Sequence, residues 1–290
     1  MKIKIKDSSE TGFYNKIRFL EPFLADKNKC GTLNNDFCRW FVGYTDGDGC
    51  FNVYLNETDS KINLTYKLSQ KENNIQVLYY MKKLLGVGKV RKDKYGMAHL
   101  LIRDKKSLEN VIIPLFESFP LKTDKIYSFK KFKKSLSIWN DREKTQSEKL
   151  NAIKNILAEE QNSIAHFNSC LNLSKEWIIG FVEAEGSFYL TKKEDSRIVH
   201  GFGITQKKNK EILEEIRKIF KIKQQVKWNR KGFWSLDTTE SKSLKIIKDY
   251  FYNTMKSRKS LIYRIWARSF RHKNKYQKLS KLQNKIRNLR

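Results

Sequence analysis

Several patterns are scarce in this sequence, and each absence narrows the class of protein. It has only four cysteines, with no CxxC pair and no histidines spaced as metal ligands beside them: Cys30, Cys38, Cys50 and Cys170. A zinc site and a disulfide framework are therefore not expected. No run approaches the roughly 18 consecutive apolar residues that predict a membrane span. The opening stretch, MKIKIKDSSE, lacks the apolar core of a secretory signal and the Arg- and Ser-rich bias of a transit peptide.

Acidic residues are also scarce relative to basic ones. The chain has 31 Asp and Glu against 60 Lys and Arg, a net charge of +29, and a pI near 9.8. An excess this large favours an extended polyanion as partner, most simply nucleic acid. A ribosome-associated or merely solvated basic surface is the alternative. Hydrophobic residues (39%) and aromatic residues (13%) are sufficient for one large domain or two ordinary ones in 290 residues.

The chain matches itself at long range. Three pairs of stretches correspond at offsets of 134 to 137 positions: GYTDGDGCF (43–51) with GFVEAEGSF (180–188), YKLSQKEN (66–73) with FGITQKKN (202–209), and LKTDKIYSFKKF (121–132) with MKSRKSLIYRIW (255–266). These collinear matches predict two tandem copies of one domain, because the period exceeds that of a solenoid.

Each copy has the same predicted order of elements. In the first, apolar spacing predicts a helix over 36–47 capped by Asp36 and stopped at Gly49. The expected elements that follow are strands at 51–56 and 62–70, a helix at 74–85, a hairpin at 88–103 turning at Tyr95-Gly96, and helices at 105–117 and 122–138. The second copy is expected to have helices at 175–184 (capped by Ser174), 209–220, 241–252 and 257–270, strands at 187–193 and 199–206, and a hairpin at 225–238 turning at Lys231-Gly232.

Domain boundaries follow from this repetition. We expect an N-terminal extension (1–35), a first repeat (36–140), a polar linker with a short helical pattern (141–173), a second repeat (174–272) and a basic tail (273–290). The spacing of Leu279, Leu282, Ile286 and Leu289 predicts an amphipathic basic helix in that tail.

An acid ends the first predicted helix of each repeat. Asp48 and Glu185 occupy equivalent positions, where the helix dipole disfavours a carboxylate by up to about 1 kcal/mol. Small residues at i and i+4 accompany them: Gly43 with Gly47, and Gly180 with Ala184. Such stripes allow two helix backbones to approach closely. If the helices pack along them, the two carboxylates become neighbours and require a cation between them. Hard oxygen ligands indicate Mg²⁺, with Ca²⁺ or Mn²⁺ as alternatives.

At this point the residues are similar to a known family. FVGYTDGDG (41–49) and IIGFVEAEG (178–186) resemble the two signature motifs of a single-chain LAGLIDADG homing endonuclease. The resemblance covers about 36–140 and 174–272. It implies an α+β fold of two pseudo-symmetric αββαββα repeats, whose antiparallel sheets form a saddle along the DNA major groove. The two motif helices would meet at the interface between the repeats.

The resemblance also implies roles for particular residues. Asp48 and Glu185 would bind the catalytic divalent metal, aided by the backbone carbonyls of Gly47 and Ala184. Gln70 and Gln206 would order water, and Lys125 and Lys259 would lie near the scissile phosphates. Asp46 and Glu183 would support the helix interface. Mg²⁺ is the expected cofactor, Mn²⁺ a substitute, and Ca²⁺ a cation that binds without supporting cleavage.

Outward strand positions are the expected DNA-reading residues. They are Asn52, Tyr54, Asn56, Thr65, Lys67, Ser69, Lys89 and Arg91 in the first copy, and Ser187, Tyr189, Thr191, Gln225, Lys227 and Asn229 in the second. The two sets differ, which predicts an asymmetric, non-palindromic target. The many lysines would contact phosphates and make binding steeply salt-dependent.

Other functions remain open on these residues. An intron-RNA maturase would need the same basic charge, and a non-cleaving DNA-binding regulator could use the same fold. A ribosome-associated structural protein would leave the paired acids unexplained. The richness in Lys, Asn and Ile indicates A/T-rich coding, so we expect an organellar, most simply mitochondrial, intron origin. The expected molecule is a monomer with internal pseudo-twofold symmetry.

Overall fold

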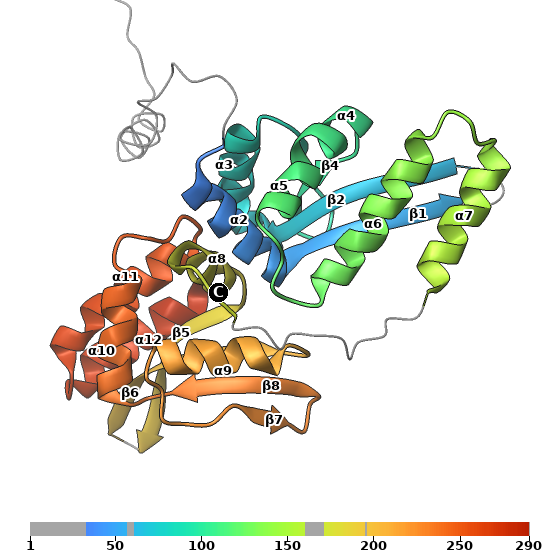
Figure 1. The fold of residues 1–290 in the computed structure, drawn as a ribbon. Coiled ribbons are helices and arrows are strands. Elements are labelled where there is room, and N and C mark those ends of the chain that lie inside the picture. Colours follow the sequence, from blue (N-terminus) through green and yellow to red (C-terminus); the bar gives the residue numbers. More distant parts are fainter. Residues whose placement is uncertain (1–32, 57–60, 160–170, 195, 290) are drawn as a thin grey trace, which may run out of the picture. The chain divides into compact units, whose positions relative to one another are not determined.

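The structure is a computed structural model that describes residues 33–56, 61–159, 171–194 and 196–289. From Asn35 onward these residues form one compact unit. Within it, a helix followed by a β-hairpin, a second helix, a second hairpin and further helices occurs twice along the chain (Figure 1). The expected α+β class and tandem repetition are therefore confirmed.

The first repeat has a four-stranded antiparallel sheet in the order β1-β2-β4-β3. Its elements are α2 (Asn35–Asp48), β1 (Gly49–Asn56), β2 (Lys61–Lys71), the 3₁₀ turn η2 (Glu72–Asn74), α3 (Ile75–Leu85), β3 (Lys89–Lys92), β4 (Met97–Ile102), α4 (Lys105–Ser107), the π-turn η3 (Leu108–Ile112), α5 (Ile113–Ser118), α6 (Lys125–Asn140) and α7 (Gln146–Ala158).

The second repeat has the equivalent sheet, in the order β5-β6-β8-β7. Its elements are α8 (Lys175–Glu185), β5 (Gly186–Glu194), β6 (Arg197–Gln206), α9 (Lys210–Ile219), β7 (Lys227–Asn229), β8 (Phe233–Thr238), α10 (Ser241–Tyr250), α11 (Lys259–Ser269), the 3₁₀ turn η4 (Phe270–His272) and α12 (Tyr276–Asn288).

Each sheet buries one face against helices and leaves the other polar. In β1, the buried ring of Phe51 contacts Tyr66, Phe116, Phe129 and Phe132. In β5, Phe188 occupies the equivalent place against Phe202, Phe251, Tyr263 and Trp266. Alternation along the strands directs the intervening residues to the opposite face. The core is therefore on the helix side, and a polar sheet face remains for another role.

The helix expected at 105–117 is interrupted by the π-turn Leu108–Ile112. Pro114 follows that turn at the start of α5. Proline has no N–H and its ring clashes with the carbonyl four residues earlier, so a regular α-helix cannot run through this position without adjustment. The wider π-turn is the adjustment, and periodicity alone did not reveal it.

The described parts of the expected linker and tail include helices that pack on the repeats, and the basic helix expected in the tail is confirmed as α12. A capping box of Thr145 and Glu148 starts α7, which packs on α6 (Figure 1). The basic helix α12 packs on α11 and β5, and the Gln283 side chain donates to the Leu190 carbonyl at 2.8 Å. Both helices thus extend the hydrophobic cores of the repeats beside them.

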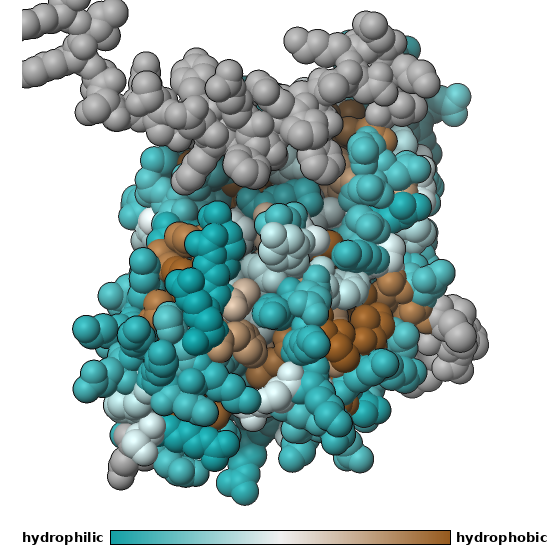
Figure 2. Space-filling view, turned by 90° about the vertical axis from the view of Figure 1, so that its left-hand side faces the viewer, coloured by the Kyte–Doolittle hydropathy of each residue, from teal (hydrophilic) through white to brown (hydrophobic). Residues whose placement is uncertain are grey.

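Figure 2 shows one face of the molecule, where hydrophilic residues predominate and apolar residues form separate areas. Within the described residues, no helix has the length and apolar character needed to cross a bilayer. Of the cysteines, Cys38 is buried and Cys50 is exposed, whereas Cys30 and Cys170 lie outside the described residues.

His200 is a buried histidine of the second repeat, and we expect it to make the stability of the fold depend on pH. Its Nε2 lies 2.7 Å from Ser269 Oγ, and its ring stacks on Phe270 with centroids 3.8 Å apart. Burial lowers the pKa of His200 to about 4, and the charge of Lys273 adds to this effect. In the unfolded chain the pKa is about 6.5, so the unfolded state binds the proton first as the pH falls.

We therefore expect the free energy of unfolding to fall by up to about 3 kcal/mol between about pH 6.5 and pH 4, because each unit of pKa difference is worth about 1.4 kcal/mol. Urea unfolding at several pH values measures this loss. In His200→Gln the loss over this interval should shrink by the same amount. An unchanged pH profile in that variant would contradict the assignment.

Candidate active site

The two motif helices α2 and α8 pack directly on each other. A Cβ atom added at Gly43 would lie 2.0 Å from the Trp177 carbonyl oxygen, and one at Gly180 would lie 2.0 Å from the Trp40 carbonyl oxygen. At Gly47 an added Cβ would lie 2.3 Å from the Ala184 Cβ. The stripes singled out in the sequence are therefore the contact line, and the backbones approach as closely as glycine allows.

This packing brings Asp48 and Glu185 together at the ends of their helices. Burial raises the pKa of both carboxyl groups, and the neighbouring Asp48 charge raises the pKa of Glu185 further. The ammonium groups of Lys125 and Lys259 act in the opposite direction on both. One acid from each repeat thus lies in a shared, partly desolvated site.

A strand begins immediately after each acid, with no loop between. Gly49 and Gly186 start β1 and β5, and neither has a positive φ. The first helix ends at Asp48, so the expected stop at Gly49 is confirmed, and the backbone there is extended rather than left-handed. An added Cβ would lie 2.4 Å from Thr45 Cγ2 at the first glycine and 2.6 Å from Val182 Cγ1 at the second. Glycine is needed here because each strand folds back tightly against its own helix.

Each acid accepts a hydrogen bond from a strand-end glutamine. Gln70 Nε2 donates to Asp48 Oδ2 at 2.6 Å. Gln206 is hydrogen-bonded to Glu185, which offsets part of the rise in the pKa of that carboxyl group. Both glutamines are the last or next-to-last residue of the second strand of their repeat, so the sheet fixes their position relative to the acids.

Two lysines lie beside the acids, at the starts of α6 and α11. Lys125 Nζ donates to the Thr45 carbonyl at 3.0 Å and also to that of Gly47. Lys259 Nζ donates to the carbonyls of Val182 at 3.0 Å and Ala184 at 3.2 Å. Burial lowers the pKa of Lys125. The carbonyls of Gly47 and Ala184, expected beside a metal, thus accept from lysine ammonium groups in this structure.

The sixth-position acids connect the repeats to each other. Asp46 accepts from Trp177 Nε1 at 2.8 Å and from the backbone N–H groups of Lys122 and Thr123. Glu183 accepts from Trp40 Nε1 at 2.6 Å and from the N–H groups of Lys256 and Ser257.

Each acid therefore binds an indole of the opposite repeat and fixes the loop ahead of its own lysine helix. The two tryptophans were not identified from the sequence, although they are 137 positions apart, the same offset as the acids.

Trp177→Phe is expected to lower the free energy of unfolding by about 1.5–3 kcal/mol. The ring volume is largely kept, but Asp46 loses a charge-assisted hydrogen bond in a buried place, where such bonds are worth this much. Chemical denaturation measures the change. Trp228→Phe is the control, because Trp228 is 55% exposed and should change stability by less than about 0.5 kcal/mol. Equal losses in the two variants would contradict the role of the indole N–H.

Two asparagines make a second pair of cross-repeat contacts. Asn74 Oδ1 accepts from the Arg258 N–H at 2.7 Å, at the start of the helix that bears Lys259. Asn209 Oδ1 accepts from the Asp124 N–H at 3.0 Å, at the start of the helix that bears Lys125. Asn74 also donates to Gln70 Oε1 at 2.7 Å. The position of each lysine therefore depends on the opposite repeat.

A cavity of about 300 Å³ opens beside these groups. Residues of both repeats line it, including Gln70, Asn74, Ala184 and Lys259. Within the described residues, no group of three or more His, Cys, Asp or Glu is arranged as a metal site. The polar groups that the two repeats bring together here are two acids, two glutamines and two lysines.

The expected DNA-reading residues lie on the polar sheet faces, with two differences. Thr65 is on that face but only 6% exposed, because it lies in the middle of the sheet opposite Asn52. Gln225 is exposed but precedes β7 and so is not a strand residue. The others are exposed or half-buried: Asn52, Tyr54, Asn56, Lys67, Ser69, Lys89, Arg91, Ser187, Tyr189, Thr191, Lys227 and Asn229.

One of these residues has a contact that the sequence did not predict. The ring of Tyr189 covers Gly201 on the neighbouring strand, where an added Cβ would lie 2.2 Å from the ring. Its hydroxyl donates to Asp237 Oδ2 on β8.

His99, on the polar face of the first sheet, was not identified from the sequence.

Two α+β repeats that share one acidic site across a pair of close-packed helices define a single-chain, two-motif protein of the homing-endonuclease fold. The chain belongs to the LAGLIDADG endonuclease family, whose profile matches residues 41–136 and 178–270.

Curated relatives include proteins of fungi and of Dictyostelium. The chain is 34% identical over 292 residues to "Probable intron-encoded endonuclease Cox1-I1b" of Schizosaccharomyces pombe, covering 96% of this chain and 76% of that protein. It is 27% identical over 212 residues to "Uncharacterized mitochondrial protein RF1" of Saccharomyces cerevisiae, covering 70% of this chain and 42% of that protein. The chain thus spans most of the first relative and under half of the second.

Solved structures share the fold. A crystal structure of the LAGLIDADG homing endonuclease I-GzeII in complex with its DNA target superposes with a TM-score of 0.75 at 21% identity, covering 87% of this chain and 97% of that one. I-SmaMI bound to uncleaved DNA in the presence of calcium ions superposes with a TM-score of 0.70 at 20% identity, covering 89% and 98%. At these identities the likeness concerns the fold.

Proposed function

We propose that this chain is a site-specific homing endonuclease that binds a long, asymmetric DNA duplex as a monomer and hydrolyses one phosphodiester bond in each strand. The observation that carries the proposal is the meeting of Asp48 and Glu185, one from each repeat, at the bottom of the helix interface. Membership of the endonuclease family and relatives named intron-encoded endonucleases support it.

The donor set fits a divalent cation of the magnesium class. Two partly buried carboxylates repel each other, and a cation between them removes that repulsion. Carboxylate and carbonyl oxygens are hard ligands, which suit Mg²⁺. Asp48 and Glu185 would hold the cation, and the carbonyls of Gly47 and Ala184 each have a second lone pair available beside their lysine contact. We propose Mg²⁺ as cofactor, Mn²⁺ as a substitute, and Ca²⁺ as a cation that binds without supporting cleavage.

A bound divalent cation would supply a polarised water and neutralise charge on the phosphate during hydrolysis. Gln70 and Gln206 hold the two carboxylates in fixed orientations and would order water around the phosphate. Lys125 and Lys259 place ammonium groups among the helix-end carbonyls, where they would stabilise negative charge developing at the phosphate.

The polar faces of the two sheets would bind the DNA. They carry different residues in the two repeats, so the two half-sites of the target should differ in sequence. With a net charge of +29, much of the affinity would come from phosphate contacts and would fall steeply with salt. We further propose an organellar, mitochondrial intron origin, which is supported by the intron-encoded and mitochondrial relatives in fungi.

The test is incubation of the chain with a plasmid library of candidate intron-insertion sites, in Mg²⁺ and in EDTA. The proposal requires linearised plasmid in Mg²⁺ and none in EDTA. Tight DNA binding without cleavage in either Mg²⁺ or Mn²⁺ would replace it by a non-cleaving regulator. Binding to intron RNA with rescue of splicing would replace it by a maturase.

A further inference from the structure

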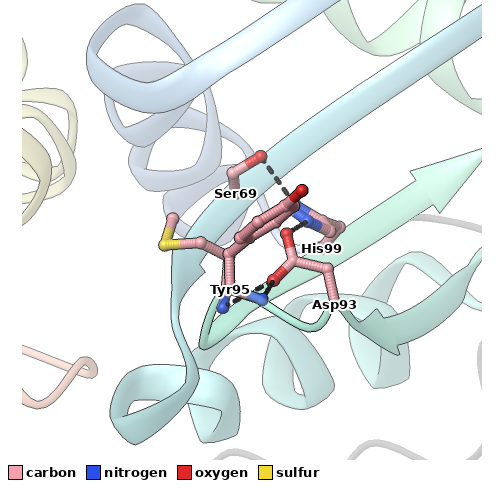
Figure 3. A network of polar contacts seen from close by, with 5 residues as sticks. Ser69, Asp93, Tyr95 and His99 are labelled. Carbon is pink, nitrogen blue, oxygen red and sulfur yellow. Dashed lines mark hydrogen bonds and ion pairs between the residues drawn. The ribbon is translucent and has the colours of Figure 1, made fainter.

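Three side chains on the polar face of the first sheet are linked by hydrogen bonds (Figure 3). They have no part in the proposed cleavage of the DNA strands. His99 Nε2 lies 2.9 Å from Asp93 Oδ2, and His99 Nδ1 lies 2.9 Å from Ser69 Oγ. Asp93 lies at the β3–β4 turn, His99 on β4 and Ser69 directly opposite on β2. On its other side His99 faces Arg91 of β3. Ser69 thus lies among residues that DNA would cover.

The acid at one end fixes the direction of both hydrogen bonds. Asp93 Oδ1 accepts from the Tyr95 N–H at 2.8 Å and the Met97 N–H at 3.0 Å, so the turn holds the carboxyl group in place. The bond from His99, and then that from Met97, keep the pKa of Asp93 below its ordinary value. An ionised carboxylate can only accept, so Nε2 of His99 carries the proton.

The opposite nitrogen of a neutral imidazole must then accept. In this neutral form of His99, the Ser69 hydroxyl donates its single proton to His99 Nδ1, and the free lone pairs of Ser69 Oγ can only accept from a ligand. In the DNA major groove, the exocyclic amines of adenine and cytosine are donors, whereas guanine and thymine present acceptors on their own edges.

We propose that Asp93 and His99 orient Ser69 as an acceptor that reads an adenine or a cytosine at one position of the half-site bound by the first repeat. This inference rests on the proposed DNA-binding function. Ser69 would contact the base, and His99 and Asp93 would act through it as positioning residues.

The second repeat shows that the fold itself does not require this chain. The residues 136 positions further on are Thr205, Asn229 and Ser235 in place of Ser69, Asp93 and His99. Asn229 Oδ1 still caps the turn, accepting from the Lys231 N–H at 2.9 Å. Ser235 Oγ donates instead to the Lys227 carbonyl at 3.3 Å. A turn-capping oxygen is therefore shared, while the acid and imidazole belong to the first repeat alone.

The substitution Asp93→Asn distinguishes a role of Asp93 in base recognition from a purely structural role in the turn. Asparagine keeps Oδ1 for the turn, as Asn229 does in the second repeat, but presents an N–H to His99 Nε2. The imidazole proton then moves to Nδ1 and points at Ser69 Oγ, which frees the serine proton for a ligand. We expect the preference for adenine or cytosine at this position to weaken, because Ser69 can then also donate to the acceptors of guanine and thymine. Ser69→Ala should remove the preference, which a single hydrogen bond sets at about two- to tenfold.

The measurement uses the duplex that the wild-type chain selects from a randomised DNA library. Binding of every single-base variant of that duplex is measured in Ca²⁺, at one fixed pH for all variants. Asp141→Asn is the control, because Asp141 also caps a turn (accepting from the Glu143 N–H at 2.9 Å) but lies between α6 and α7, off the sheet. The Asp141→Asn substitution removes one negative charge, as Asp93→Asn does, and should leave the base preference unchanged.

Each outcome decides the proposal. A preference that changes at the same single position in Asp93→Asn and disappears in Ser69→Ala supports it. If the Asp93→Asn profile matches that of the wild type, or changes as much in Asp141→Asn, the inference is wrong while the proposed function stands. A wild-type chain that selects no duplex would contradict the proposed function, and with it this inference.

Discussion

Asp48→Asn and Glu185→Gln are each expected to lower the rate of DNA cleavage at least about a thousandfold while leaving DNA affinity within about threefold. A thousandfold corresponds to about 4 kcal/mol, within the several kcal/mol that a bound cation contributes to a reaction of this kind. Both acids belong to one site, where the Asp48 charge acts on Glu185. Loss of either should therefore impair cleavage of both strands.

These variants should not lose stability. Both carboxyl groups have a raised pKa, caused first by burial, so their charged forms are unfavourable in the fold without a cation. The melting temperature without divalent metal should equal or exceed that of the wild type. Cleavage is followed on supercoiled plasmid, and Glu215→Gln, a surface change on α9, is the control for charge. Full cleavage by Asp48→Asn would sink the assignment of the site.

Gly180→Ala is expected to destabilise the chain by about 3 kcal/mol and to abolish cleavage with it. The new methyl group would lie 2.0 Å from the Trp40 carbonyl oxygen and 2.8 Å from the Tyr44 amide nitrogen. Backbone atoms of a helix cannot move aside singly, so α2 and α8 must separate along their whole contact. Overpacking a tight core typically costs 1–3 kcal/mol, and a backbone clash belongs at the upper end.

Gly96→Ala is the matched control for this substitution. Gly96 has a φ of 75°, and no atom lies within 4 Å of an added Cβ. The cost there is only that of the left-handed backbone, about 1–2 kcal/mol, and cleavage should survive. Urea unfolding and plasmid cleavage of both variants give the comparison. If Gly180→Ala proves no more costly than Gly96→Ala, the two helices do not meet as described.

Sequence reasoning located the acids, the glycine stripes and the strand-end glutamines because each occurs twice at one offset. Repetition supplied the information that a single copy lacks. Asp48 alone would be interpreted as an ordinary carboxylate at a helix end. Its equivalence to Glu185 is what predicts that the two acids form one site. Element positions followed for the same reason, since periodicity in one copy could be checked against the other.

Contacts that cross between the repeats were not predicted, because they depend on how the two domains are placed in space. The matching of 66–73 with 202–209 aligns Asn73 with Asn209, but the structure uses Asn74 as the counterpart of Asn209. The shift of one residue comes from the short 3₁₀ turn Glu72–Asn74, which no spacing rule specifies. His99 was missed for the opposite reason: its repeat partner is Ser235, so symmetry gave no signal.

The reciprocal bonds Trp40–Glu183 and Trp177–Asp46 have a consequence for building chimaeras. If each half binds its own part of the target, as the proposed function implies, halves of related two-repeat chains could be recombined to address new target sequences. In this chain, however, a half has the indole for its neighbour's acid and the acid for its neighbour's indole. A transplanted half can form both hydrogen bonds only if the other half has a tryptophan and an acid at the matching positions. The tryptophan and the acid must therefore be transferred together.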